Sequence, residues 1–291
     1  MLQKFFDTHT HFNFNAFKED SQEAMKRALA QNIWFINVAS EAKTAERAVK
    51  MAEEFEQGVY ASIGLHPIHT FEDEFEEEVK GEKVKFVTRA EEFDRAFYSG
   101  LIERSEKVVA VGEIGLDYFH LRNFSVGKQH ELRKKQQRVF SEQIELAIEK
   151  KLPLILHCRA LDGYDAYEDM FDILEKAKQK YSNLSGVLHC FTGDSAVMKK
   201  FLAMGFYFGF NGIITFARNY DEPLKAIPQD RLLLETDAPW LAPVPYRGKR
   251  NESLYVPEVA KKMAEIREEE FEKVAHYTTA NALKLFGIDK K

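Results

Sequence analysis

Short apolar segments alternate with longer amphipathic segments along this chain. The apolar segments carry aliphatic and aromatic residues at both odd and even positions, which is typical of strands buried on both faces of a parallel sheet. We expect eight strands, at residues 2–6, 33–39, 59–64, 108–112, 152–156, 186–188, 206–210 and 232–234. Helical periodicity lies between them, for example at residues 41–56, 129–151, 165–180 and 195–204. Eight β-α repeats predict an α/β fold of the TIM (β/α)8 barrel type, with an open doubly wound sheet as the alternative.

Residues 70–106, between the third and fourth expected strands, interrupt this alternation. Phe71, Phe75 and Val79 recur every four residues in an acidic stretch, and this spacing predicts an acidic amphipathic helix lying on the barrel. We interpret the segment as a helical insertion within one domain, residues 1–291, because no linker divides the chain. Residues 256–288 predict further helices, with Gly287 as a stop signal.

Composition narrows the class of protein. The chain has 291 residues, of which 45% are hydrophobic, enough for a core without disulfides or structural metals. Lys and Arg number 41 and Asp and Glu 47, giving a net charge of −6, which argues against general coating of nucleic acid. Cys158 and Cys190 form no disulfide framework, and we expect both to point towards the helix layer. Without a signal peptide or a membrane-length apolar run, we expect a cytoplasmic protein with no obligate protein partner and no membrane contact.

Polar side chains follow the expected strands at their carboxyl ends, where a barrel of this class carries its catalytic groups. His9 and His11 follow the first strand, and because side chains alternate along a strand they point to the same side. The other strand-end candidates are Glu113, His157, His189, Glu235 and Asp237.

Four histidines and two carboxylates at one rim predict bound cations. Packed together without ligands, these groups would be desolvated and left with unsatisfied lone pairs. Imidazole and carboxylate are normal donors for divalent ions, and six donors are more than one catalytic ion takes. The set therefore predicts two divalent metal ions per chain that share one carboxylate, with Glu113 as the best bridge. Such donors fit zinc, manganese, nickel or iron, and magnesium could support activity.

Seven motifs in this order closely resemble the TatD family of metal-dependent deoxyribonucleases, within the amidohydrolase-like barrel superfamily. One is Phe-Asp-Thr-His-Thr-His-Phe at residues 6–12, and another is Val-Gly-Glu-Ile-Gly-Leu-Asp-Tyr at residues 111–118. The others lie at residues 64–67, 156–159, 188–193, 232–243 and 278–282. A short His-x-His is common by chance, whereas this ordered series spans nearly the whole chain and is highly specific.

The resemblance implies a ligand set and a substrate. It implies hydrolysis of phosphodiester bonds in DNA, whereas the residue spacing alone indicates only a binuclear hydrolase. The implied ligands are His9, His11 and Asp237 for one ion and His157 and His189 for the other, with Glu113 touching both. The chain departs from the family in its long segment at residues 70–106 and in a basic residue, Arg122, that comes late after Asp117 and Tyr118.

The predicted mechanism assigns roles to Glu113 and Asp237. Two ions bridged by Glu113 would lower the pKa of a shared water to about 7. Asp237, as a terminal ligand, is either a ligand alone or also the general base that accepts the proton of this water. Glu235 shares strand parity with Asp237 and either orients a ligand or makes a structural hydrogen bond.

Substrate contacts are expected from His66, Arg159 and Arg250. His66 and Arg159 follow the third and fifth strands, where charge-assisted hydrogen bonds to a phosphate would orient the substrate. Arg250 forms a basic patch with Arg247 and Lys249 beyond the last strand. For all of them an ordinary surface role remains open.

Two other functions remain open from the sequence. One is a barrel of the same superfamily that hydrolyses a small ester, lactone or amide; many of these bridge their metals with a carboxylated lysine, and no lysine ends the fourth expected strand. The other is a metal-stabilised binding or scaffold protein. Glycine-rich nucleotide loops, Gly-x-Ser-x-Gly and Cys-x-x-Cys are absent from the sequence, which disfavours nucleotide-driven transfer, hydride transfer and serine hydrolysis.

Overall fold

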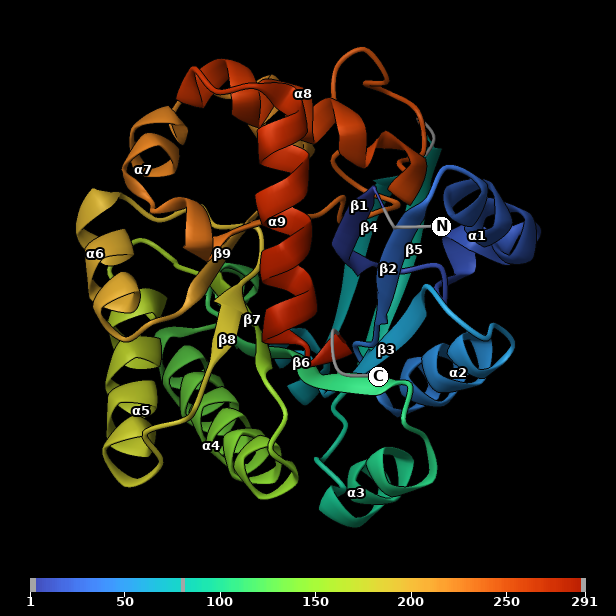
Figure 1. The fold of residues 1–291 in the computed structure, drawn as a ribbon. Helices are drawn as coiled ribbons and strands as arrows, with labels where there is room; N and C mark the ends of the chain where they lie inside the picture. The colour runs from blue at the N-terminus through green and yellow to red at the C-terminus, as the bar shows by residue number, and fades with distance from the viewer. Residues whose placement is uncertain (1–3, 80–81, 289–291) are drawn as a thin grey trace.

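The computed structural model describes residues 4–79 and 82–288, in which eight parallel strands form a nearly closed barrel inside a layer of helices (Figure 1). The sheet order is β1-β2-β3-β6-β7-β8-β9-β10, so consecutive barrel strands are neighbours. The predicted α/β barrel is confirmed, and each predicted strand has its counterpart. The strands are β1 (Phe5–Thr10), β2 (Ile33–Val38), β3 (Val59–Ile63), β6 (Val108–Asp117), β7 (Leu154–Arg159), β8 (Gly186–Leu188), β9 (Tyr207–Phe210) and β10 (Leu232–Leu234).

Helices connect the strands and cover the outside of the barrel. The amphipathic segments predicted between the strands correspond to α2, α4, α5 and α6, and the tail forms α8 and α9. The helices are α1 (Ser21–Ala30), α2 (Ala42–Glu53), α3 (Arg95–Arg104), α4 (Val126–Lys150), α5 (Ala166–Lys180), α6 (Ser195–Ala203), α7 (Asp221–Ala226), α8 (Val256–Arg267) and α9 (Phe271–Leu285). Among the described residues, no helix combines the length and apolar character needed to cross a bilayer.

The barrel closes between β1 and β10 through a few contacts at their carboxyl ends. The backbone N–H of His11 donates to the carbonyl of Ala238 at 2.8 Å, and that of Asp237 donates to the carbonyl of His9 at 2.8 Å. The Thr8 hydroxyl donates to the carbonyl of Leu234 at 3.0 Å. These bonds fix the first and last strands together at the point where His9 and Asp237 emerge.

The interior of the barrel is filled by an apolar cluster that draws side chains from all eight strands, Phe6 and Tyr60 among them. Leu285, Phe286 and Ile288, at the end of α9, belong to the same cluster, and the Phe286 ring stacks on Phe6. Since the polar strand-end residues occupy the carboxyl end of the barrel, the end of α9 closes the opposite, amino end. In Figure 1, α9 crosses the front of the barrel to reach this position.

The acidic part of the insertion at residues 70–106 differs from the prediction. Instead of a helix, β4 (Glu72–Val79) and β5 (Glu82–Arg89) form an antiparallel pair in which Phe75 lies opposite Phe86. The helix prediction was wrong because a spacing of four residues fits one helical turn but is also a multiple of two. Residues four apart therefore share one face of a strand as well. Among the residues of this segment that the structure describes, α3 is the one α-helix.

Candidate metal centre

His9 and His11 meet at the carboxyl end of β1. Both side chains are buried, and their Nε2 atoms are 3.0 Å apart. His11 is held from behind, because its Nδ1 lies 2.9 Å from the carbonyl oxygen of Val38 on β2. The two imidazoles therefore present their Nε2 atoms to the same small space.

Local irregularities in the strands accompany these side chains. The pairing of β1 with β2 shifts register between Asp7 and Thr10, and that of β6 with β7 shifts between Val111 and Ile114. Such β-bulges re-aim side chains and are frequent beside active sites. The shift in β1 includes His9, and the shift in β6 includes Glu113.

Glu113 lies between two groups of imidazoles. Its Oε2 is 3.4 Å from His9 Nε2 and 4.0 Å from His11 Nε2. Its Oε1 is 2.9 Å from His157 Nδ1 and 3.4 Å from His66 Nε2. The two oxygens of this buried carboxylate thus face different groups, which is the arrangement that a bridging ligand requires.

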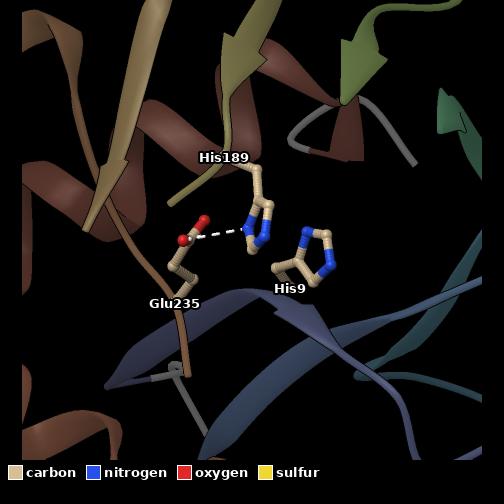
Figure 2. A group of neighbouring side chains, drawn as sticks. All are labelled: His9, His189 and Glu235. Carbon is tan, nitrogen blue, oxygen red and sulfur yellow. Dashed lines mark ion pairs between the residues drawn. The ribbon is translucent and has the colours of Figure 1, made fainter. Parts of the chain in front are cut away.

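His189 lies between Glu113 and Asp237. Its Nε2 is 3.7 Å from Glu113 Oε1 and 3.8 Å from Asp237 Oδ1. Its other nitrogen, Nδ1, is 3.0 Å from Oε1 of Glu235, and the His9 ring stacks beside it with ring centroids 3.5 Å apart (Figure 2). Glu235 is fully buried. Because its carboxylate faces Nδ1, it directs Nε2 of His189 towards the cluster.

Asp237, in the loop after β10, lies beside His9 and His11 and forms one group of possible ligands with them. Its Oδ1 is 3.4 Å from His11 Nε2 and 3.8 Å from His9 Nε2. Its backbone has a φ of 57°, in the left-handed region that residues other than glycine seldom adopt. Cys190 also has a positive φ, and its Sγ lies within 4.8 Å of ligand atoms of His189 and Asp237. The expectation that Cys190 points to the helix layer is therefore wrong, because this turn breaks the strand alternation.

The spacing of these donors fits divalent metal ions. Two ligands about 2.1 Å from one tetrahedral ion lie about 3.4 Å apart. The separations of His9 from Glu113 and of His11 from Asp237 are both 3.4 Å. Nδ1 of His11 donates to the Val38 carbonyl at 2.9 Å, so in the neutral ring Nε2 of His11 carries a lone pair, and Nε2 of His9 lies 3.0 Å from it. A cation facing both Nε2 atoms would be bound by their lone pairs.

The imidazoles divide by their pKa values. Burial lowers the pKa of His9 to about 4, with a further contribution from the charge of His189. For His157, burial also acts to lower the pKa, but hydrogen bonds with the Asp117 and Glu113 carboxylates outweigh it and raise the pKa to about 9. For His189, the Glu235 and Asp237 charges likewise overcome burial and raise the pKa to about 10. At neutral pH, His9 is therefore a ready donor, whereas His157 and His189 carry protons that a metal ion must displace.

The two central carboxylates remain ionised. Burial acts to raise the pKa of Glu113, but the imidazoles of His66 and His9 hold it well below its ordinary value. Burial opposes ionisation of Asp237 too, and the positive charge of His189 lowers its pKa. Both groups can therefore offer oxygen lone pairs to a cation.

Asp117 belongs to the site although the sequence analysis did not identify it as a site residue. Its fully buried Oδ2 lies 2.9 Å from His157 Nε2 and 2.8 Å from His120 Nδ1. His157 is thus held between Glu113 on one nitrogen and Asp117 on the other. Its position was a possible signal, because Asp117 follows Glu113 by four residues in one strand and so tends to share its face.

The three predicted phosphate contacts have different environments. His66 is buried within the cluster. Arg159 is exposed at the end of β7, with its guanidinium carbon 3.8 Å from the centre of the Phe119 ring. Arg250 is held away from solvent by two hydrogen bonds of 2.6 Å to the carboxylate of Asp20. Because these bonds occupy its guanidinium, Arg250 is not presented as a substrate contact.

Comparison with known proteins identifies the family. The model of the family described as TatD related DNase matches residues 6–287. The uncharacterized metal-dependent hydrolase YabD of Bacillus subtilis is 39% identical, over 98% of this chain and 99% of its own. The 3'-5' ssDNA/RNA exonuclease TatD of Erwinia tasmaniensis is 32% identical, over 97% of this chain and all 100% of its own. Among solved structures, the TatD homolog YJJV of Escherichia coli K12 superposes with a TM-score of 0.79 at 29% identity, covering 99% of both chains. The chain therefore belongs to the TatD family of metal-dependent hydrolases.

Proposed function

We propose that the protein is a deoxyribonuclease that hydrolyses phosphodiester bonds with two divalent metal ions. The observation that carries this proposal is the position of Glu113, whose two carboxylate oxygens face two different groups of imidazoles. In phosphoryl chemistry, a pair of ions a few ångströms apart stabilises the attacking and leaving oxygens of an in-line displacement. The name of the Erwinia relative, an exonuclease acting on single-stranded DNA and RNA, supports a polynucleotide substrate.

The ligands divide into two sets that share Glu113. His9, His11 and Asp237 would hold one ion, and His157 and His189 the other. When bound, the ions would make a water molecule acidic enough to ionise near neutral pH.

We assign to Asp237 the role of accepting the proton of the attacking water. Its pKa is lowered, so at neutral pH its carboxylate is in the ionised form that a general base requires. Its side chain is 14% exposed, whereas that of Glu113 is 7% exposed. Asp237 is therefore the more accessible of the two carboxylates, which favours it over Glu113 for this role.

His66 and Arg159 are suited to hold the phosphate. Nδ1 of His66 accepts the backbone N–H of Ile68 at 3.3 Å, so in the neutral ring the proton is on Nε2, which faces the cluster. This N–H suits a phosphate oxygen better than a metal ion. Arg159 forms no ion pair with the described residues, and its guanidinium rests on the Phe119 ring. It is therefore available to a substrate anion.

The proposal is tested by pairing metal analysis with cleavage assays. The metal content of the purified protein is measured by elemental analysis. Hydrolysis is then measured on single-stranded, nicked and duplex DNA of one sequence, and in parallel on small esters and lactones. Each assay is repeated after chelation and after metal is restored. We expect metal-dependent cleavage of DNA that is lost on chelation and recovered on reloading. Turnover of an ester or lactone by metal-loaded protein that leaves every DNA substrate intact would overturn the proposal.

A further inference from the structure

The loops after β9 and β10 carry a set of aromatic, aliphatic and basic side chains, most of them exposed, that the metal centre does not use. We call this set the rim platform, and it consists of Phe216, Val244, Tyr246, Arg247 and Lys249. Phe216 follows the short 3-10 helix Gly212–Thr215 after β9, and the other four follow β10. Both segments leave the barrel at its carboxyl end, on the same side as the metal centre.

The loop that carries the platform is anchored beside the metal centre. It starts at Asp237 and continues through Trp240, whose ring packs on His11 with centroids 5.3 Å apart. Asn251 holds the start of this loop in place, because Nδ2 of Asn251 donates to the carbonyls of Thr236 at 2.8 Å and Trp240 at 2.7 Å. The platform thus has a fixed position relative to the proposed ligands.

The two segments of the platform are packed against each other through their backbones. A Cβ on Gly212 would lie 1.9 Å from the carbonyl oxygen of Leu241, so only glycine permits this approach. The backbone N–H of Val244 donates to the hydroxyl of Thr215 at 2.9 Å. Phe216 and Arg247 are therefore held together, with the guanidinium carbon 3.9 Å from the centre of the ring.

The charges of the platform are unpaired, unlike those of its neighbours. Among the described residues, neither Arg247 nor Lys249 forms an ion pair. Arg247 donates one hydrogen bond to the carbonyl of Ala242, and the Lys249 ammonium lies 5.8 Å from the centre of the Tyr246 ring. Arg250, in the same loop, pairs with Asp20.

Exposure sets the aromatic part of the platform apart as well. Phe216 is 40% exposed, whereas every other phenylalanine whose side chain the structure describes is buried or half-buried. The Tyr246 ring stacks on the Tyr255 ring, with ring centroids 3.9 Å apart and an angle of 9° between the ring planes. An exposed ring such as Phe216 beside unpaired cations is a feature with which proteins bind single-stranded nucleic acid, because bases stack on rings and phosphates contact basic groups.

We propose that the rim platform binds unpaired nucleotides of a single-stranded polynucleotide, next to the phosphodiester bond held at the metal centre. This inference rests on the proposed function and extends it, because it names the side chains that would hold the nucleotides beside the scissile bond. Phe216 provides the stacking surface, and Arg247 and Lys249 contact the phosphates. In a chain with a net charge of −6, this local positive charge directs a polyanion to one edge of the barrel.

The experiment measures binding of metal-loaded protein to a phosphorothioate-linked oligothymidylate of about 12 nucleotides, which resists cleavage and spans the site size of one binding surface. We expect Phe216→Leu, which keeps an apolar side chain but removes the ring, to raise Kd about five- to 100-fold, and Phe216→Trp to keep wild-type affinity. Arg247→Gln is expected to reduce the slope of log Kd against log salt by about 0.7. Fluorescence anisotropy gives both quantities.

Arg218→Ala is the matched control, because Arg218 is an exposed arginine near Phe216 that is paired with Asp221 at 2.7 Å. We expect this variant to bind like the wild type. Hydrolysis of a small chromogenic phosphodiester, bis(4-nitrophenyl) phosphate, is measured for every variant. The platform variants should retain it, because the platform contacts nucleotides that this compound lacks.

The outcomes separate the two proposals. Unchanged oligonucleotide affinity in Phe216→Leu and Arg247→Gln, with normal DNA cleavage by the wild type, would overturn the platform and leave the proposed function standing. Binding that depends on Phe216 in a protein that hydrolyses no phosphodiester would overturn the proposed function alone. A wild type that neither binds nor cleaves the oligonucleotide would overturn both.

Discussion

The metal centre and the β4–β5 pair are both rich in ionisable side chains, but their surroundings differ. Glu113 is 5% exposed and faces imidazoles with both oxygens. In the β4–β5 pair, Glu74 and Lys85 meet across the strands at 2.5 Å, with side chains 54% and 66% exposed. An exposed ion pair contributes at most about 1 kcal/mol to stability. Buried charges of the centre must instead find partners, and their pKa values shift. Burial, and not the number of charges, distinguishes a chemical site from a solvated surface.

The strongest test of the buried side of this comparison is Glu113→Gln. We expect this variant to lose activity by at least about 10³-fold and also to lose at least one bound metal ion, because an amide is a poor bridge between two cations. Glu131→Gln on α4 is the control, since Glu131 pairs with Lys128 on an exposed helix face. Elemental analysis and a DNA cleavage assay check both variants. Full metal content with normal turnover in Glu113→Gln would contradict the bridging role.

Metal affinity should depend on pH through the raised pKa of His157. At pH 7 this imidazole holds a proton, since its pKa is about 9, and a metal ion must displace it. Because His189, the other proposed ligand of this ion, also holds a proton that the ion must displace, with a pKa of about 10, we expect the affinity to rise about 10⁴-fold from pH 7 to pH 9 and to level off above about pH 10. In the metal-free protein the same proton stabilises the fold below about pH 6.5, and this contribution disappears as the pH rises through 9. Titration against a chromophoric chelator at several pH values measures the affinity, and a flat or falling profile would refute the expectation.

A smaller effect is expected from Asp117→Asn, which tests how His157 is oriented. The amide keeps the shape of the carboxylate but loses its charge, so the hold on His157 Nε2 weakens. We expect metal affinity to fall about 10- to 100-fold, as for other residues that orient a ligand. Asp169→Asn is the control, because Asp169 accepts its hydrogen bond from Tyr118 outside the cluster. Equal metal affinity in Asp117→Asn and the wild type would show that Asp117 does not position the ligand.

The smallest effect is expected from Phe75→Ala, in the β4–β5 pair. Phe75 stacks on Phe86 with ring centroids 6.4 Å apart and packs on His120 at 4.8 Å. Its loss should lower the free energy of local opening of β4 and β5 by about 1–2 kcal/mol. Amide hydrogen exchange resolves this local change from the free energy of global unfolding. Phe208→Ala, at a fully buried position, should instead destabilise the whole barrel by about 3–5 kcal/mol. Equal protection losses in all strands for Phe75→Ala would contradict independent opening of the β4–β5 pair.

The barrel was predictable because its strands are buried on both faces and its helices are amphipathic. Those two periodicities are properties of the sequence alone. The β4–β5 pair was not predictable, because the spacing of Phe71, Phe75 and Val79 fits both a helix and a strand. The choice between them depends on the pairing of Phe75 with Phe86, which is a tertiary contact.

The positions of the proposed ligands at the strand ends were predictable, but the directions in which their side chains point were not. The register shifts at His9 and Glu113 depend on the neighbouring strands, and no local sequence pattern predicts them. The same limit explains Arg250. It stands in a basic run of the sequence, yet its ion pair with Asp20 joins segments from opposite ends of the chain. Charge patterns along a sequence cannot show which cation is already paired.

The seam between β1 and β10 has a consequence for synthesis of the protein. Asp7, on the first strand, accepts hydrogen bonds from the hydroxyls of Thr236 and Ser253, which follow the last strand. A ribosome delivers Thr236 229 residues after Asp7 and Ser253 246 residues after it. The catalytic pocket therefore cannot assemble on a growing chain, and hydrolysis starts only in a molecule whose final barrel strand has been made and docked.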